Sequence, residues 1–197
     1  MTARRWIVGL ITIAAIAVFA VTLVHALWYA PDSEVPAPQL AVHAADVPEG
    51  QLPDRLVIPK IGIDAHVKHV GVDAKGNMAT PGNFTDVAWY KYGTPPGYNG
   101  SAVIDGHVDN GLALAGVFKH LDELSVGDDV YIRTASSTTL HFKVVERDEY
   151  DYKQVPLDKL FNRSDGAYLN LITCGGTFIP TEKSYDHRLV IYTKLVS

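Results

Sequence analysis

The 197-residue sequence is 47 % hydrophobic and 20 % charged, with a formal net charge of −5 at pH 7. This length and composition suffice for one globular core, and the acidic balance argues against nucleic-acid binding, which requires a basic patch. The single cysteine, Cys174, excludes an intramolecular disulfide. The sequence has no zinc-type Cys/His spacing, phosphate-binding loop or EF-hand loop, so it predicts neither a metal site nor a cofactor.

An apolar segment covers residues 6–30 and contains no Asp, Glu, Lys or Arg. It is long enough to cross a bilayer as a helix, which requires about 20 residues, and we predict an uncleaved transmembrane signal anchor. Arg4 and Arg5 precede it and acidic residues follow it. The positive-inside rule therefore places residues 1–5 in the cytoplasm and the rest of the chain outside. The alternative is a cleaved signal peptide, because Val24-His25-Ala26 resembles a cleavage site.

A proline-rich segment, residues 31–53, holds five of the eleven prolines and shows neither helical nor strand periodicity. This composition is typical of an extended linker. We therefore expect a tether that holds the following domain, residues 54–197, away from the membrane.

From Arg55 onward, short β-branched runs alternate with turn residues. The pattern is typical of an all-β barrel or sandwich and not of βαβ units. The predicted strands are Arg55 to Ile61, Ala65 to Val70, Ala102 to Gly106, Asp129 to Thr134, Leu140 to Arg147, Tyr168 to Cys174 and Arg188 to Val196. A short helix is predicted over Ala115 to Leu124, since four apolar residues there would share one face.

The only cysteine follows a run in which apolar and polar residues alternate from Leu169 to Thr173. The alternation predicts a half-buried strand, and the two glycines after Cys174 predict that the strand stops there. A free cysteine is by default a small buried hydrophobe. If the last predicted strand pairs with this one, however, Arg188 would lie beside the thiol and favour the reactive thiolate.

A nucleophilic cysteine also needs a proton partner, usually an imidazole. His107 follows a glycine at the end of an apolar run, the same kind of position that Cys174 occupies. Asp105 would project from the same face of an extended strand, so we predict that its carboxylate favours the imidazolium form of His107. His187 is the competing histidine, but on an extended strand it would point away from Arg188.

Three separated motifs together resemble the sortases, membrane-anchored cysteine transpeptidases of Gram-positive bacteria, and within them class F of actinobacteria. The matches are Gly106-His107, the run Leu171-Ile172-Thr173-Cys174 and Arg188, with support from Ile58 to Gly62, Pro95 to Gly97 and Leu124 to Asp128. The resemblance covers Leu52 to Val196. Two departures stand out: Asn170 replaces the first threonine of the family's T-L-x-T-C pattern, and Asp105 replaces a small apolar residue.

The resemblance implies a closed eight-stranded β-barrel with short helices. It also implies that Cys174 is the nucleophile, His107 the general acid and base, Arg188 the group that stabilises the oxyanion, and Thr173 part of the substrate groove. The expected partners are secreted proteins with an LPxTG-type sorting signal and a cell-wall precursor amine such as that of lipid II. The signal would be cut after threonine through a thioester and joined to that amine.

Other interpretations stay open at this point. The same residues would suit a membrane-anchored cysteine endopeptidase, in which water resolves the thioester. An L,D-transpeptidase usually shows a Ser-His-Gly-Cys run that this sequence lacks, and papain-like peptidases place the cysteine before the histidine. A non-catalytic barrel that binds a wall component would have an inert Cys174 that resists alkylation at neutral pH. A sulfur enclosed in the interior, or remote from either partner, would exclude the catalytic interpretation.

Overall fold

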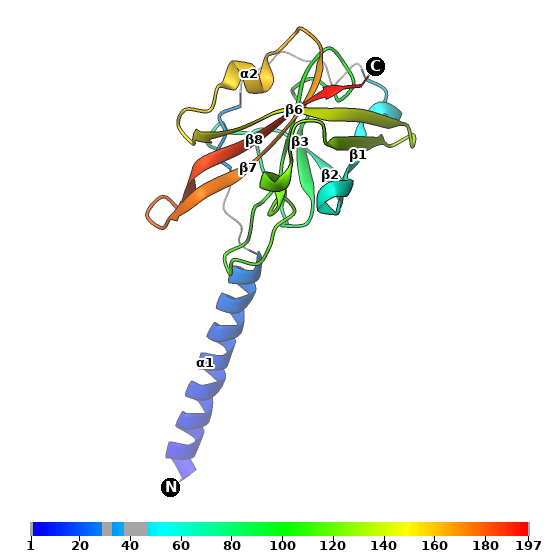
Figure 1. Cartoon of the computed structure of the whole chain (residues 1–197). Helices are drawn as coiled ribbons and strands as arrows, with labels where there is room; N and C mark the ends of the chain where they lie inside the picture. Colours follow the sequence, from blue (N-terminus) through cyan, green and yellow to red (C-terminus); the bar gives the residue numbers. More distant parts are fainter. Residues whose placement is uncertain (1, 29–32, 38–46, 197) are drawn as a thin grey trace.

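The computed structural model describes residues 2–28, 33–37 and 47–196. Helix α1 (Thr2–Trp28) extends away from the β domain that forms the rest of the chain (Figure 1). Within it, the apolar stretch Arg5–Leu27 has no buried residues and is long enough to cross a membrane. These properties are consistent with a single-pass membrane anchor.

Eight strands close into a barrel in the order β1-β2-β3-β4-β7-β8-β6-β5, which confirms the predicted fold class. The pairs β2/β3 and β4/β7 are parallel and the other neighbouring pairs are antiparallel. Closure leaves no exposed sheet edge. The strands are β1 (Pro53–Ile58), β2 (Ile63–Val70), β3 (Val87–Tyr90), β4 (Gly100–Asp105), β5 (Asp129–Thr134), β6 (Thr139–Asp151), β7 (Ala167–Ile179) and β8 (Ser184–Leu195).

Seven of these strands correspond to predicted ones, whereas β3 was not predicted. All four residues of β3 are buried, so the strand lacks the polar and apolar alternation that would reveal it. The predicted helix over Ala115 to Leu124 is wrong, because only the 3-10 turn η4 (Leu121–Glu123) forms there. Three apolar side chains of this segment, Phe118, Leu121 and Leu124, are nevertheless buried. Helix α2 (Leu157–Phe161) and the 3-10 turns η2 (Glu49–Gln51) and η3 (Pro59–Ile61) complete the structure.

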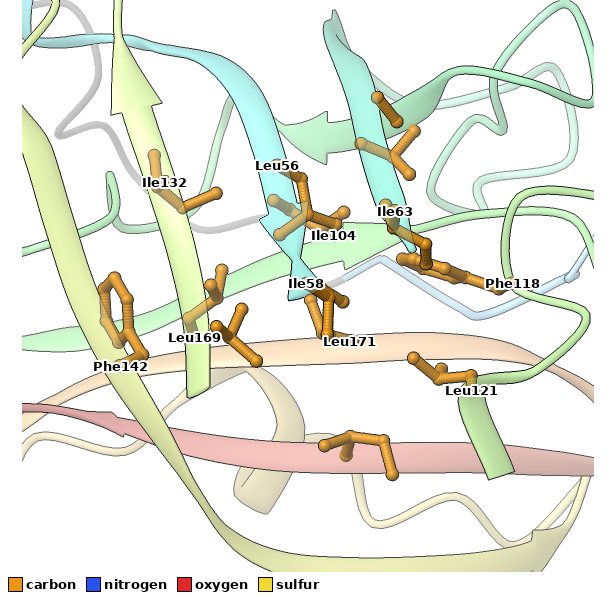
Figure 2. Packing of buried hydrophobic residues seen from close by; sticks show 14 of the residues in the cluster. Leu56, Ile58, Ile63, Ile104, Phe118, Leu121, Ile132, Phe142, Leu169 and Leu171 are labelled. Carbon is orange, nitrogen blue, oxygen red and sulfur yellow. The ribbon is translucent and has the colours of Figure 1, made fainter. Parts of the chain in front are cut away.

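The main core fills the inside of the barrel (Figure 2). Alternate residues of the strands point inward, as the two-residue period of a strand requires. Phe118 and Leu121, from the segment after β4, pack onto the same cluster. The labelled members of this core are Leu56, Ile58, Ile63, Ile104, Phe118, Leu121, Ile132, Phe142, Leu169 and Leu171.

A second apolar layer lies on the outer face of β3, β4, β7 and β8. Its strand residues alternate with those of the main core, and helix α2 and Val35 cover it. The buried members of this outer layer are Val35, Met78, Tyr90, Val103, Leu160, Phe161, Ile172, Val190 and Tyr192. These four strands are therefore apolar on both faces, which explains their long uninterrupted hydrophobic runs.

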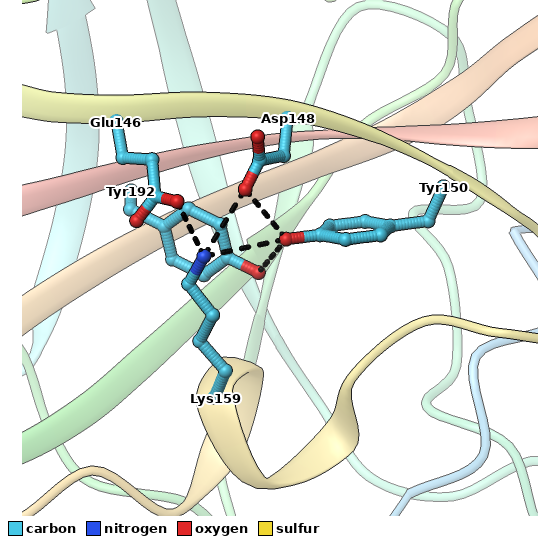
Figure 3. Close-up of polar contacts among 5 residues, drawn as sticks. All are labelled: Glu146, Asp148, Tyr150, Lys159 and Tyr192. Atoms are coloured by element: carbon cyan, nitrogen blue, oxygen red, sulfur yellow. Dashed lines mark hydrogen bonds and ion pairs between the residues drawn. The ribbon is translucent and has the colours of Figure 1, made fainter.

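A polar cluster fastens α2 to the sheet beside this outer layer (Figure 3). The Nζ of Lys159 lies 2.6 Å from Glu146 Oε1 and 3.1 Å from Asp148 Oδ2, and 4.3 Å from the centre of the Tyr192 ring. Burial alone would lower the pKa of Lys159, but hydrogen bonds to Glu146, Asp148 and Tyr150 outweigh it and raise this pKa. The charged form is therefore the stable one.

We expect Lys159→Met to lower the free energy of unfolding by about 1–3 kcal/mol, because two carboxylates lose a charged donor. The hydrogen bond from Tyr150 lowers the pKa of Asp148 below its ordinary value of 3.8. The stabilisation should therefore be complete above about pH 4 and be lost as the pH falls through the lowered pKa. Urea unfolding at pH 7 and pH 3 tests this. Lys143→Met, at an exposed pair with Asp129, should lower the free energy of unfolding less, because water screens the exposed charges.

Candidate active site

The strand that carries Cys174 does not end at this residue, so that prediction is wrong. Strand β7 continues to Ile179, and its register with β8 shifts between Gly175 and Phe178. Gly176 has a φ of 76°, a conformation that glycine adopts without steric cost. The two glycines therefore form a bulge, which increases local twist, and the β7–β8 hairpin extends beyond the cysteine.

Three neighbouring strands bring Cys174, Arg188 and His107 to the same level. Cys174 on β7 and Arg188 on β8 are direct partners in the antiparallel register. On the other side of β7, the parallel register pairs Asp105 with Ile172. The same offset places His107, just past the end of β4, level with Cys174. Since adjacent strands are about 4.8 Å apart, the three residues lie in one region of the surface.

Thr173 ties β7 to the residue before His107. Its hydroxyl donates to the Gly106 carbonyl at 2.7 Å, and the Gly106 amide donates to the Ile172 carbonyl at 3.3 Å. Thr173 is buried and lies on the opposite face of the strand from Cys174. Thr173 therefore fixes the distance between β7 and the chain just past the end of β4.

His107 is held by its side chain and its backbone. The ring Nε2 lies 2.9 Å from the carbonyl oxygen of Pro81, which can only accept a hydrogen bond, so Nε2 carries the proton. The Phe118 amide donates to the His107 carbonyl at 2.9 Å. A Cβ on Gly116 would come within 2.3 Å of this carbonyl oxygen. Glycine is thus required where the loop crosses the histidine.

We therefore expect Gly116→Ala to destabilise the protein by about 1–3 kcal/mol, because the loop or His107 must move to relieve the clash. The control is Gly50→Ala, whose added Cβ would meet Ser136 at an ordinary 3.4 Å. It should change the free energy of unfolding by less than about 0.5 kcal/mol. Urea denaturation of both variants measures the difference, and equal effects would contradict the close packing around His107.

The Arg188 guanidinium is buried and is oriented largely by its own strand and hairpin. Nη1 donates to the carbonyls of Tyr185 and His187 at 2.9 and 2.8 Å, and Nη2 donates to the Ser184 hydroxyl at 3.0 Å. The remaining bond runs from Nε to the carbonyl of Ser33 at 2.5 Å. The β8 hairpin therefore fixes the fork, and Nε faces the segment that lies over the site.

That segment, Ser33 to Ala37, belongs to the region predicted as a solvated tether, yet it is docked on the barrel. The Met78 amide donates to the Val35 carbonyl at 2.8 Å, and the Val35 side chain is buried in the outer apolar layer. Lys75 pairs with Glu34 at 2.7 Å. Residues 38–46 of the predicted tether lie outside the described part of the chain.

Ser33 is the residue of this segment that reaches the three-strand site. Its carbonyl accepts from Arg188 and its hydroxyl donates to Asp105 Oδ1. Its side chain also lowers the pKa of Cys174, which is only 2 % exposed. No sequence signal marked Ser33, whereas Asp105 had already stood out as a departure from the sortase pattern.

Comparison with known proteins identifies the fold around this site. The family model described as the sortase domain matches residues 56–196.

The chain belongs to the sortase family.

Solved sortase structures agree with this assignment. Sortase C from Clostridium perfringens SM101 is 20 % identical, with 82 % of this chain and 78 % of that chain covered and a TM-score of 0.57. Sortase C-1 from Actinomyces oris is 25 % identical, with 73 % and 72 % covered and a TM-score of 0.56. Sortase A from Corynebacterium diphtheriae is 22 % identical, with 74 % and 61 % covered and a TM-score of 0.56. No curated protein matches the chain by sequence.

In this sortase the thiol is held protonated. Burial, together with the carboxylates of Asp105 and Asp109, raises the pKa of Cys174 to about 12, although Arg188 and Ser33 lower it. Arg188 thus favours the thiolate, as expected, but removal from water outweighs the guanidinium. The buried thiol is therefore unreactive in this arrangement.

The thiol is nevertheless not enclosed in the barrel interior. Cys174 lines a cavity of about 320 Å³ together with charged side chains from neighbouring elements, Lys119, Asp122, Arg147 and Glu149. Tyr185, another lining residue, donates from its hydroxyl to Asp109 at 2.6 Å. Burial and this acidic neighbour raise the pKa of Tyr185. No sequence signal pointed to Asp109 or Tyr185.

Among the described residues, no group of three or more His, Cys, Asp or Glu side chains could hold a metal ion. Three other histidines of the barrel domain have partners away from this site. His120 contacts Glu123, His141 contacts Asp129 and His187 contacts Asp186. His187 is thus directed to its sequence neighbour, as expected for a residue that alternates with Arg188 along the strand.

Alkylation of Cys174 by iodoacetamide at pH 8 should be at least ~10²-fold slower than that of an exposed cysteine, because only the thiolate reacts. Val35→Asp should accelerate it by releasing the docked segment, since a charge would enter the outer apolar layer. Val72→Asp makes the same change at an exposed site and should leave the rate unaltered. Mass spectrometry of the labelled full chain gives the rates, and equal rates in both variants would contradict covering by Ser33 to Ala37.

Slow alkylation is thus expected of a catalytic and an inert cysteine alike. Only turnover can distinguish the two interpretations of Cys174.

Proposed function

We propose that this sortase is a cysteine transpeptidase that cleaves an LPxTG-like sorting signal after threonine and joins the acyl group to a cell-wall amine. The proposal is supported by the backbone register of three neighbouring chain segments, which brings a cysteine, an arginine and a histidine to the same level. Cys174 is paired with Arg188 across β7 and β8, and the β4 register brings His107 level with both. Each residue type supplies a different requirement of acyl transfer.

In the first half-reaction, His107 Nδ1 accepts the proton of the Cys174 thiol, and the resulting thiolate attacks the carbonyl carbon of the threonine. The oxygen of that carbonyl becomes an oxyanion, and the Nε–H of Arg188 stabilises it in place of the Ser33 carbonyl that it binds in the covered site. The carbon–nitrogen bond then breaks, and His107 donates a proton to the leaving amine. The product is a thioester on Cys174.

In the second half-reaction, an amine enters and attacks the thioester carbonyl. His107 accepts a proton from the attacking nitrogen, and the carbon–sulfur bond breaks to return the thiolate. We infer that such an amine approaches through the 320 Å³ cavity that Cys174 lines.

The orientation of His107 assigns its proton transfer to one nitrogen. Because Nε2 is bonded to the Pro81 carbonyl at 2.9 Å, Nδ1 is the nitrogen that gains and loses a proton during the cycle. Thr173 contributes by holding β7 to the Gly106 carbonyl. We infer that it shapes the site indirectly, because it does not face the same side of the strand as Cys174.

The membrane position follows from α1 and its flanking charges. Arg5 begins the apolar stretch, and Glu34 lies just beyond its far end. We propose that the N-terminus is cytoplasmic and that residues 54–197 act as the catalytic domain outside the plasma membrane. The natural partners would then be secreted proteins with sorting signals and a membrane-bound precursor such as lipid II.

Narrower features of the proposal depend on the motifs alone. The resemblance to class F of actinobacteria rests on the Gly106-His107 and Leu171 to Cys174 motifs and on Arg188. The alternative functions are a membrane-anchored endopeptidase, in which water replaces the amine, and a non-catalytic wall-binding barrel. The buried and fully oriented Arg188 fork favours catalysis over simple binding, because it presents one N–H donor beside the sulfur.

The test is to incubate the full chain in detergent micelles with an LPxTG peptide and hydroxylamine, followed by mass spectrometry. A peptide hydroxamate cut after threonine would support transpeptidation. Free acid even at high hydroxylamine would favour the endopeptidase. Absence of any cleavage would contradict both and leave the binding barrel.

A further inference from the structure

Ser33 presents a hydroxyl and a carbonyl to the site at the same time. Its carbonyl oxygen lies 2.5 Å from Arg188 Nε, and its hydroxyl donates to Asp105 Oδ1. The same side chain interacts with the Cys174 thiol and lowers its pKa. Two polar groups of a single residue are therefore bound side by side, next to the sulfur, by a cation and a carboxylate.

Asp105 is an unusual residue for this position in the fold. It is only 1 % exposed, at the end of β4 and beside Ile172 of β7. It stands where the sortase pattern leads one to expect a small apolar side chain. A buried carboxylate is costly unless donors satisfy it, and the Ser33 hydroxyl donates to Oδ1 in the covered site. A substrate that displaces Ser33 removes this hydrogen bond unless it supplies a donor of its own.

We propose that Asp105 is a specificity-determining residue that binds the side-chain hydroxyl of the substrate residue whose carbonyl Cys174 attacks. The inference rests on the proposed function. A threonine whose carbonyl is bound by Arg188 offers the same two groups as Ser33. A valine has nearly the same shape but would leave the carboxylate without its donor. Loss of one hydrogen bond to a charged group corresponds to a factor of about 10–100 in affinity.

Binding provides a test that does not require turnover. Fluorescently labelled LPxTG and LPxVG peptides would be titrated into the full-length Cys174→Ala protein in detergent micelles, and their Kd values compared by anisotropy. The threonine peptide should bind about 10–100-fold more tightly. Adding Asp105→Ala should reduce this ratio to near 1, and Asp105→Asn should retain part of it, because the amide oxygen still accepts a hydrogen bond.

Each ratio is measured within one variant, so a general loss of affinity cancels. The matched control is Asp122→Asn. It removes a carboxylate that lines the cavity but is not the one bonded to the Ser33 hydroxyl, so the ratio of the two Kd values should stay unchanged. The ratio of kcat/KM for hydroxamate formation, measured with Cys174 intact, should follow the binding ratio.

An unchanged ratio in Asp105→Ala, or absence of binding by both peptides, would overturn the inference. If the threonine peptide binds more tightly but no hydroxamate forms, the inference about Asp105 stands and the proposed transpeptidation is contradicted. Thermal unfolding of each variant checks that the barrel is intact. If Asp105→Ala does not fold, Asp105→Asn alone decides the outcome. A Kd ratio in Asp105→Asn equal to that in the protein with Asp105 intact would count against the inference.

Discussion

Replacing Cys174 with alanine is expected to abolish hydroxamate formation from an LPxTG peptide. The substitution removes the sulfur that we propose forms the thioester, and the sequence contains no other cysteine to replace it. Loss of a nucleophile typically costs several orders of magnitude in rate, so we expect a decrease of at least ~10³-fold. Mass spectrometry of the peptide products, with the full chain in detergent, measures the effect.

The folded state should tolerate this change. Cys174 lies at the edge of a cavity, and alanine preserves the strand geometry of β7. A thermal unfolding midpoint within a few degrees of the unmodified chain would confirm an intact barrel. His107→Ala should lose turnover to a similar extent, because both residues act in one step and their effects do not add. Product formation by Cys174→Ala would contradict the proposed nucleophile.

Replacing Arg188 with alanine is expected to lower kcat/KM by a factor on the order of 10²–10³, the usual loss when one oxyanion donor is removed. Arg188→Lys should recover only part of the rate, since lysine lacks the planar fork that three hairpin acceptors hold in place. Steady-state kinetics with the threonine peptide and hydroxylamine give both values.

Arg188 also contributes to folding, so stability must be measured beside the rate. The alanine variant leaves the acceptors of Tyr185, His187 and Ser184 without their donor, and we expect a loss of about 1–3 kcal/mol in the free energy of unfolding. Kinetics are therefore compared at a temperature where every variant is folded. Arg147→Ala is the control, because Arg147 is an exposed cation that lines the same cavity. An equal rate loss in this control would argue that Arg188 acts only through general electrostatics.

These effects are linked to the covering of the site by Ser33. The same Nε–H that would stabilise the oxyanion is bonded to the Ser33 carbonyl, and the thiol is protonated because it is buried. A substrate must therefore displace Ser33 before either group can act. The affinity of a sorting signal is expected to include the free-energy cost of releasing residues 33–37.

The sequence by itself determined the features that depend on short stretches of chain. Short β-branched runs bounded by turn residues located seven of the eight strands, uninterrupted hydrophobicity located α1, and residue chemistry singled out Cys174, His107 and Arg188. The strand β3 and the glycine bulge after Cys174 were not predicted. A four-residue strand that is buried on both faces has no alternation, and a glycine pair suits a bulge as well as a strand end.

Only the tertiary structure decided what surrounds the sulfur. The hydrogen bond between Ser33 and Asp105 joins residues 72 positions apart, and that between Arg188 and Ser33 joins residues 155 positions apart. Whether such groups meet depends on how the closed barrel stacks its strands and which loop or terminal segment packs over them, and local periodicity carries no information about that. The protonation of Cys174 likewise follows from burial by a distant segment, so the neighbouring residues in the sequence could not reveal it.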